Sequence, residues 1–393
     1  MIDSPGLEGI QRRWGVTVRA GATFSRHVRL KAYLLLRQIV RTVRYFWAMM
    51  MGDVSGISQA PVMAKSALKI RQKSSVSPIL TSRLPSSQEI WDACVRSHDS
   101  TGVWPISFSY PKQVRVPTKD QAPTLCPMFP GHKYSFDNES LYLDAYARHL
   151  FGLTHKKAGW DCFRHVEIFA SGAIPFMPDA SLIPTHTMVH YPKVFLREVA
   201  SHLLREQGTL SAGVIQEVRD YFARHLTTRS MAEYLLKVAS PLAPRRILFV
   251  DDEVGETPDY QSVLTLIGLK QLLGNRVAVS SPVPYLYSDW SGNSRGLYGR
   301  GFGYTKVLSS TQKSAAEASD SFEPWKGWIP DQGDLLVVGS ISRNYERAVE
   351  LLNRFTPSQT VWIHGEDEGP SASDISRYRD FGVTVFAREL DPH

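Results

Sequence analysis

The sequence predicts an α/β protein. Its C-terminal part, residues 244–393, alternates short apolar strands with helical patterns, which is typical of a parallel sheet covered by helices on both faces. The chain has 393 residues, 43% of them hydrophobic, so it is long enough for about two domains and is not disordered throughout. No run of about 18 uncharged apolar residues occurs, which argues against an ordinary membrane-spanning helix.

Residues 1–74 are expected to form a basic N-terminal arm and linker. The first 73 residues carry 13 Lys and Arg against three acids, a net charge of +10, whereas the whole chain carries +7. The rest of the chain is therefore nearly neutral, which favours an arm on an anionic surface over a nucleic-acid-binding fold. Residues 31–51 predict an amphipathic helix, which would lie on an anionic membrane surface or pack on the protein itself.

The middle of the chain, residues 75–243, alternates loop-like and ordered stretches. Residues 52–90 are rich in Ser, Pro and Lys and indicate a linker, and residues 105–130 are rich in Pro and indicate loops. A helix capped by Asp137 or Asn138 is expected to end near Gly152. The remaining expected elements are a helix at 162–171, a strand at 173–177 and two helices within 193–240.

From residue 244 onward the pattern is that of a Rossmann-like domain. Five apolar runs of strand length alternate with helical patterns or a loop, without an internal repeat. The expected strands are 247–250, 277–280, 335–338, 360–363 and 383–386, and the expected helices are 260–273, 343–355 and 373–380.

Acidic residues follow several of these strands. Ligands of a parallel sheet bind at the carboxyl ends of its strands, where short acidic loops can hold a general base or bind sugar hydroxyls. For any single acid, capping of the next helix is the simpler explanation, but the convergent set favours a site. The candidate general bases are Asp252, Asp259, Glu366 and Asp367.

The string 247–253, Ile-Leu-Phe-Val-Asp-Asp-Glu, permits other interpretations. It resembles the first strand of a response-regulator receiver domain, in which paired acids hold Mg²⁺ beside a phosphorylated aspartate. Asp289 has roughly the right place for that aspartate, but the expected Met-Pro and Lys-Pro partners are missing. It also resembles the metal-binding Asp-x-Asp of another glycosyltransferase fold, although here it opens a domain instead of lying inside one.

The segment 156–176 carries the most specific pattern, KKAGWDCFRHVEIFASGAIPF. Lys156 and Lys157 precede a helix N-terminus, which favours an anion through its free N–H groups and dipole. Arg164 can clamp a diphosphate, and Glu167 on the same helical face can accept hydrogen bonds from sugar or ribose hydroxyls. The alternative is an ordinary amphipathic helix whose Arg–Glu pair faces water.

This segment resembles the donor-binding motif of exostosin-like glycosyltransferases of family 47, close to G-W-D-x-x-R-x-x-E-x-x-x-x-G-x-I-P. The resemblance implies a GT-B architecture of two Rossmann-like domains facing a cleft, with a nucleotide-sugar donor and a glycan acceptor. It carries over diphosphate contact to Arg164 and nucleotide contact to Glu167, with Gly172 and Pro175 shaping the wall. Residues 75–243 would then bind the donor and 244–393 would lie on the acceptor side. In that family the acceptor-side domain precedes the motif, so the domain order here would be permuted or the first part reduced.

An inverting reaction of this kind needs an acid to deprotonate the acceptor and cations to stabilise the leaving diphosphate. Since Lys156, Lys157 and Arg164 supply the cations, neither a metal nor a resident cofactor is expected. Two alternatives remain: a signalling protein with a degenerate receiver-like domain at 244–393, and a catalytically inactive glycan-binding relative. Three scattered cysteines indicate a reduced, cytoplasmic protein, held at the inner face of a membrane if residues 31–51 bind it.

Overall fold

The computed structural model describes residues 83–111, 121–128, 136–204, 210–240, 244–319 and 328–390. The expected amphipathic helix at 31–51 and the other residues of the arm up to 74 lie outside this set. Within the described residues, no helix has the length and apolar character needed to cross a membrane.

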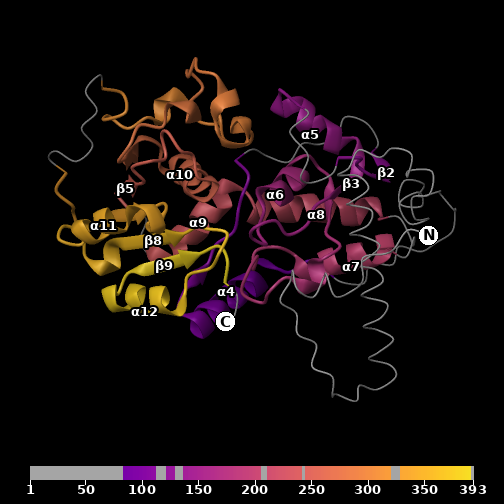
Figure 1. The fold of residues 1–393 in the computed structure, drawn as a ribbon, viewed down its shortest axis with the longest axis horizontal. Coiled ribbons are helices and arrows are strands. Elements are labelled where there is room, and N and C mark those ends of the chain that lie inside the picture. The colour runs from indigo at the N-terminus through magenta and orange to yellow at the C-terminus, as the bar shows by residue number, and fades with distance from the viewer. Residues whose placement is uncertain are drawn as a thin grey trace, which may run out of the picture. The chain divides into compact units, whose positions relative to one another are not determined.

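Six parallel strands form the main sheet, in the order β1-β9-β8-β7-β5-β6. Figure 1 labels β5, β8 and β9 of this sheet. The strands are β1 (Trp104–Pro105), β5 (Arg246–Val250), β6 (Val277–Val279), β7 (Asp334–Val338), β8 (Thr360–His364) and β9 (Thr384–Ala387). The prediction of an α/β fold with a parallel sheet after residue 244 is confirmed. The chain passes from β5 to β6 on one side and then returns to β7 on the other, so the topological switch point lies between β5 and β7.

The main sheet is buried on both faces, as a parallel sheet must be. Alternate residues of β5 show this directly, because Ile247 and Phe249 belong to one hydrophobic cluster and Leu248 and Val250 to another. The first cluster includes residues of α9 (Thr228–Ala239) and α10 (Tyr260–Leu273). The second includes residues of α11 (Ile341–Leu351) and α12 (Ala372–Phe381).

A second sheet has three parallel strands in the order β2-β3-β4. These are β2 (Ala122–Leu125), β3 (His149–Leu153) and β4 (Ile174–Phe176). Between them the chain forms α5 (Glu139–Ala147), which ends where β3 starts, and α6 (Phe163–Ala170), which connects β3 to β4 (Figure 1). Each sheet therefore presents the carboxyl ends of its strands along one edge.

Three expectations for the middle of the chain are wrong. Residues up to 90 were expected to be a linker, yet α4 (Ser87–Thr101) starts inside them with a capping box between Ser86 and Glu89. The helix expected to continue to Gly152 ends at Ala147, because the next residues pair with β2 and β4 as β3. Residues 193–240 contain three helices, α7 (Lys193–Leu204), α8 (Ala212–His225) and α9.

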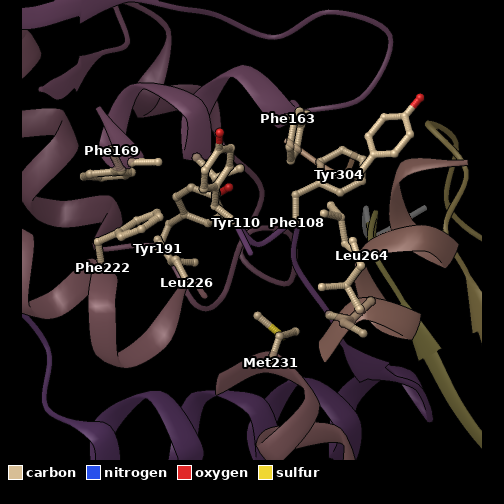
Figure 2. Close-up of a cluster of buried hydrophobic side chains, with 14 of the residues drawn as sticks. Phe108, Tyr110, Phe163, Phe169, Tyr191, Phe222, Leu226, Met231, Leu264 and Tyr304 are labelled. Atoms are coloured by element: carbon tan, nitrogen blue, oxygen red, sulfur yellow. The ribbon is translucent and has the colours of Figure 1, made fainter. Parts of the chain in front are cut away.

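The two parts of the chain share one buried cluster. Figure 2 shows Phe108 and Phe163 from the earlier part beside Leu264 and Tyr304 from the later part. The ring of Phe163, the first residue of α6, also stacks on Tyr260, the first residue of α10, with centroids 4.3 Å apart. The starts of these two helices, which follow strands of different sheets, are thereby packed against each other.

Candidate functional site

The motif segment forms the connection from the carboxyl end of β3 into α6. Lys156 and Lys157 are exposed on this connection, and the Lys156 ammonium lies 5.1 Å from the ring centroid of Trp160. The backbone N–H of Lys156 donates to the carboxylate of Asp179, which follows β4, at 2.9 Å. The two lysines therefore stand at the edge of the three-stranded sheet where a ligand is expected.

The N-terminus of α6 lacks the side-chain features that usually neutralise it. Its N-cap residue, Cys162, makes no side-chain capping bond, and the first turn contains no acid. Arg164 lies in that turn and is partly exposed. The N–H groups, the helix dipole and the guanidinium together favour an anion at this position.

Glu167 is buried, with 2% of its surface exposed. The Tyr142 hydroxyl donates to its Oε2 at 2.9 Å, while its Oε1 has no hydrogen-bond partner among the described residues. Burial raises the pKa of Glu167 to about 7, against the opposing effects of the Arg164 charge and the Tyr142 hydrogen bond. A carboxylate so enclosed has little surface for the direct hydroxyl contact expected of it, and it interacts with Arg164 through its charge.

Gly172 and Pro175 lie away from the N-terminus of α6. Gly172 takes a left-handed φ of 82° in the turn that follows the C-terminus of α6, where its carbonyl accepts hydrogen bonds from Gln121 and Arg219 at 3.2 and 3.3 Å. Pro175 is the central residue of β4, paired with Gly152 of β3. The structure thus brings Lys156, Lys157 and Arg164 to one edge, but it places Gly172 in the turn before β4 and Pro175 within the sheet.

The Gly-Trp-Asp part of the motif contacts the end of the main sheet. The backbone N–H of Asp161 donates to Glu389 Oε1 at 2.8 Å, and Arg388 Nη1 donates to the Asp161 carbonyl at 2.5 Å. A side chain on Gly159 would have no room, since an added Cβ would lie 2.5 Å from Glu389 Oε1. These residues therefore join the carboxyl edge of β3 to the carboxyl edge of β9.

Asp161 itself is enclosed in this junction. Its carboxylate accepts from the Phe108 N–H at 2.8 Å and from the Tyr191 hydroxyl at 2.9 Å. Burial raises the pKa of Asp161 to about 7, although Arg388 acts in the opposite direction. All of these contacts are within the protein, which gives Asp161 a structural role in holding the two sheets together.

At the switch point of the main sheet, a fully buried aspartate accepts hydrogen bonds from several side chains. Asp251, which directly follows β5, accepts from the Ser262 hydroxyl at 2.5 Å, from Asn344 at 3.2 Å and from the Arg343 guanidinium. Arg343 and Asn344 lie in the first turns of α11, which begins after β7. The contacts fix the start of α11 against the end of β5.

The four predicted bases lie along the same edge in different surroundings. Asp252 is exposed, and its carboxylate lies 3.6 Å from Arg347. Asp259 caps α10 by accepting from the Ser262 N–H at 2.8 Å, and burial raises its pKa. Asp367 accepts from Arg388 Nη2 at 2.6 Å.

Glu366 has the most elaborate environment of the four. His364 Nδ1 lies 2.9 Å from its Oε2, and the hydroxyls of Ser342 and Ser340 approach its Oε1, the latter at 3.4 Å. Burial alone would raise the pKa of Glu366, but the contacts with His364 and Ser342 outweigh it and lower the pKa to about 2.

Two residues of this edge were not predicted as site residues, His364 and Arg388. His364 ends β8 two positions before Glu366, so its place was readable from the strand pattern, but only the acids were considered as bases. No sequence pattern around Arg388 predicts its role, because its partners Gly365, Asp367 and Asp161 come from distant segments of the chain. Through Arg388 the carboxyl edges of the two sheets form one connected set of polar groups.

Comparisons with protein-family models, with curated proteins and with solved structures find no match for this chain. Among the described residues, no group of three or more His, Cys, Asp and Glu side chains is arranged to hold a metal ion. The interpretation of the site therefore depends on its own geometry and chemistry.

Proposed function

We propose that the protein is a glycosyltransferase of GT-B type that moves a sugar from a nucleotide-sugar donor to a glycan or polysaccharide acceptor. One observation supports this more than any other: the carboxyl edges of two parallel sheets meet, through Arg388 and Glu389 on one side and Asp161 on the other. Ligands of parallel sheets bind at those edges, so a donor and an acceptor held by different sheets would be brought together there.

The donor side of the proposed site is the start of α6. Arg164, with Lys156 and Lys157, would bind the diphosphate together with the N–H groups of the helix, and would stabilise the charge that develops on it as it leaves. Glu167, enclosed beside Arg164 and Tyr142, would keep the guanidinium oriented. With cationic side chains in this role, the proposed reaction uses no metal.

The acceptor side would be formed by the main sheet and the long connection between β6 and β7. In that connection Tyr298 is 65% exposed, and its ring centroid lies 5.2 Å from that of Tyr260. Because Tyr260 stacks on Phe163, this exposed ring is linked through one other ring to the start of α6. An aromatic face suits the C–H surface of a sugar, so Tyr298 is the proposed contact for the acceptor.

The test is donor binding followed by transfer. A panel of UDP-, GDP- and CMP-sugars is screened for thermal stabilisation of the protein, since a donor at 100 times its dissociation constant stabilises a fold by about 2.7 kcal/mol. We expect one nucleotide class to stabilise the wild type and Arg229→Ala, which removes an exposed arginine of α9, but not Arg164→Ala. Equal stabilisation of all three proteins, or of none, would contradict the proposal.

A signalling protein is the second candidate, because the strand order β6-β5-β7-β8-β9 is also that of flavodoxin-like folds, to which receiver domains belong. Against it, β7 is followed by Gly339 and Ser340, where the phosphorylated aspartate would be expected. Asp289 instead lies in the connection between β6 and β7, paired with Lys313 at 2.7 Å. Phosphate uptake from acetyl phosphate, lost in Asp289→Asn, would favour this candidate. Glycan binding without any donor turnover would instead indicate an inactive relative.

The membrane contact of residues 31–51 is a separate proposal, as is a position at the inner, cytoplasmic face. It follows from the +10 charge of the first 73 residues, which would bind anionic headgroups. Sedimentation with vesicles of phosphatidylserine and phosphatidylcholine tests it. Binding that requires the anionic lipid and is lost on deletion of residues 1–74 supports the contact, and equal binding to neutral vesicles contradicts it.

A further inference from the structure

We propose that His364 is the general base of this transferase and that Glu366 is the positioning residue that orients it. The inference rests on the proposed function and assigns the proton transfer, for which the sequence had suggested only acids. Its structural basis is the contact between the last residue of β8 and the acid two positions later, at the carboxyl edge of the main sheet.

The contact determines which imidazole nitrogen is basic. His364 Nδ1 lies 2.9 Å from Glu366 Oε2. The contact is a close ion-pair distance without hydrogen-bond geometry, and neither atom has another hydrogen-bond partner among the described residues. An ionised carboxylate can only act as an acceptor, so its charge at this distance favours the proton on Nδ1. The other nitrogen, Nε2, then carries the lone pair and is the atom that can remove a proton.

Glu366 is itself held in place. Its Oε1 accepts from the Ser342 hydroxyl, and the Ser340 hydroxyl lies 3.4 Å away. Ser340 is the N-cap residue of α11 and Ser342 lies in its first turn, so the carboxylate is fixed to the start of the helix that follows the neighbouring strand β7. A carboxylate that binds an imidazole from one side stabilises the imidazolium formed when the base accepts a proton. A carboxyl group whose pKa is lowered to about 2 is itself a weak base, which favours the imidazole over Glu366 for proton removal.

The surroundings of His364 are acidic on two sides. Glu366 contacts it from its own loop, and Asp374 in the first turn of α12 is close enough for His364 to affect its pKa. Arg388 is bound one residue away, at the Gly365 carbonyl, and not to the imidazole. The His364 side chain is mostly covered, with 11% of its surface exposed.

Arg388 also connects this base to the donor side. Its Nε donates to the Gly365 carbonyl at 2.8 Å, and its Nη1 donates to Asp161, three residues before Arg164. In the proposed single displacement, His364 Nε2 takes the proton of the acceptor hydroxyl while the acceptor oxygen forms a bond to the anomeric carbon. The bond from that carbon to the diphosphate breaks, and its electron pair stays on the diphosphate oxygen, next to Arg164.

The test compares transfer rates and their pH dependence in the full chain with the donor that stabilises the wild type. We expect His364→Gln to lower kcat by about 100-fold or more, the usual range for loss of a general base, while donor-dependent thermal stabilisation is unchanged. We expect Glu366→Gln to lower kcat less and to move the acidic limb of the pH–rate profile to lower pH, because the imidazolium loses its anion. The controls are Glu368→Gln, an exposed acid of the same loop, and His202→Gln in α7, both expected to match the wild type.

The outcomes separate the two proposals. A wild type that turns over no nucleotide-sugar overturns the proposed function. A wild type that is active, with a folded His364→Gln variant retaining more than half of its rate, overturns only the role of His364. If His364→Gln does not fold, Glu366→Gln decides: an acidic limb that stays where it is in the wild type overturns the inference, and a shifted limb supports it.

Discussion

Arg388 donates a 2.5 Å hydrogen bond from Nη1 to the carbonyl oxygen of Asp161, which lies 227 residues earlier in the chain. The same guanidinium binds the Gly365 carbonyl and the Asp367 carboxylate, and only 2% of its surface is exposed. A single buried side chain thus joins the ends of β8 and β9 to the loop that leads into α6. If a reaction takes place between the two sheets, Arg388 sets their spacing.

Replacing Arg388 with methionine should strongly destabilise the fold. Glu389 and Asp161 would then remain buried without the cation that compensates them, a situation that costs about 3–5 kcal/mol. Urea denaturation at pH 7 measures the change in the free energy of unfolding. The control is Arg245→Met, which removes an exposed pair with Asp331 and should cost about 1 kcal/mol or less. Equal costs for the two variants would contradict a structural role for Arg388.

Gly159→Ala should disturb the same junction from the other side. The added methyl would lie 2.5 Å from Glu389 Oε1 and 3.0 Å from Arg388 Nη1, so the buried pair must shift or the loop must move. We expect a loss of about 1–3 kcal/mol, typical of overpacking. The matched control is Gly213→Ala in α8, where the nearest atom is 3.9 Å away and alanine favours the helix. We expect the melting temperature to fall in Gly159→Ala and to rise in Gly213→Ala. An unchanged melting temperature in Gly159→Ala would contradict the prediction.

The raised pKa of Glu167 predicts a stability gain on its removal. The folded-state pKa of about 7 exceeds the ordinary value of 4.5, so the folded state binds the proton more tightly than the unfolded state. Stability should therefore fall as the pH rises from about 4.5 to 7, and then level off. Glu167→Gln keeps an acceptor for the Tyr142 hydroxyl but carries no charge, so it should be more stable than the wild type at pH 8 by about 1–3 kcal/mol.

Denaturation at pH 4, 6 and 8 tests this linkage, with the exposed Glu233→Gln as control. The advantage of Glu167→Gln should disappear near pH 4, whereas Glu233→Gln should follow the wild type throughout. A variant that is less stable than the wild type at pH 8 would show that the carboxylate is a net stabilising group. If Glu167 orients Arg164, the gain in stability should be accompanied by weaker stabilisation by the donor.

The elements of the main sheet were predictable because their signals are local. Helix α10 begins and ends where expected, since Asp259 caps its start and Gly274 follows its end. The strands β5, β7 and β8 are apolar runs because both faces of a parallel sheet are covered. In contrast, β3 was mistaken for the end of a helix, because only its pairing with β2 and β4 makes it a strand.

The site was predictable only as a set of strand ends. Periodicity placed Asp252, Asp259, Glu366 and Asp367 on one edge, and the structure has them there. The periodicity of the sequence could not show which of these acids is paired with another side chain of the protein. The burial of Glu167 could not be predicted from the sequence either, because it depends on Tyr142 in another helix and on the packing around both residues.

The last prediction concerns Tyr298, which is exposed and therefore costs little to remove. Tyr298→Ala should leave the melting temperature within a few degrees of the wild type, because 65% of the residue is in contact with solvent. If its ring stacks on the acceptor, the loss of about 0.5–1.5 kcal/mol should raise the acceptor KM by up to about tenfold, without affecting stabilisation by the donor. Tyr298→Phe keeps the ring and should behave as the wild type. The control is Leu182→Ala, another exposed apolar side chain, expected to leave KM unchanged. An unchanged acceptor KM in Tyr298→Ala would place the acceptor elsewhere, and an equal rise in Tyr298→Phe would assign the contact to the hydroxyl instead of the ring.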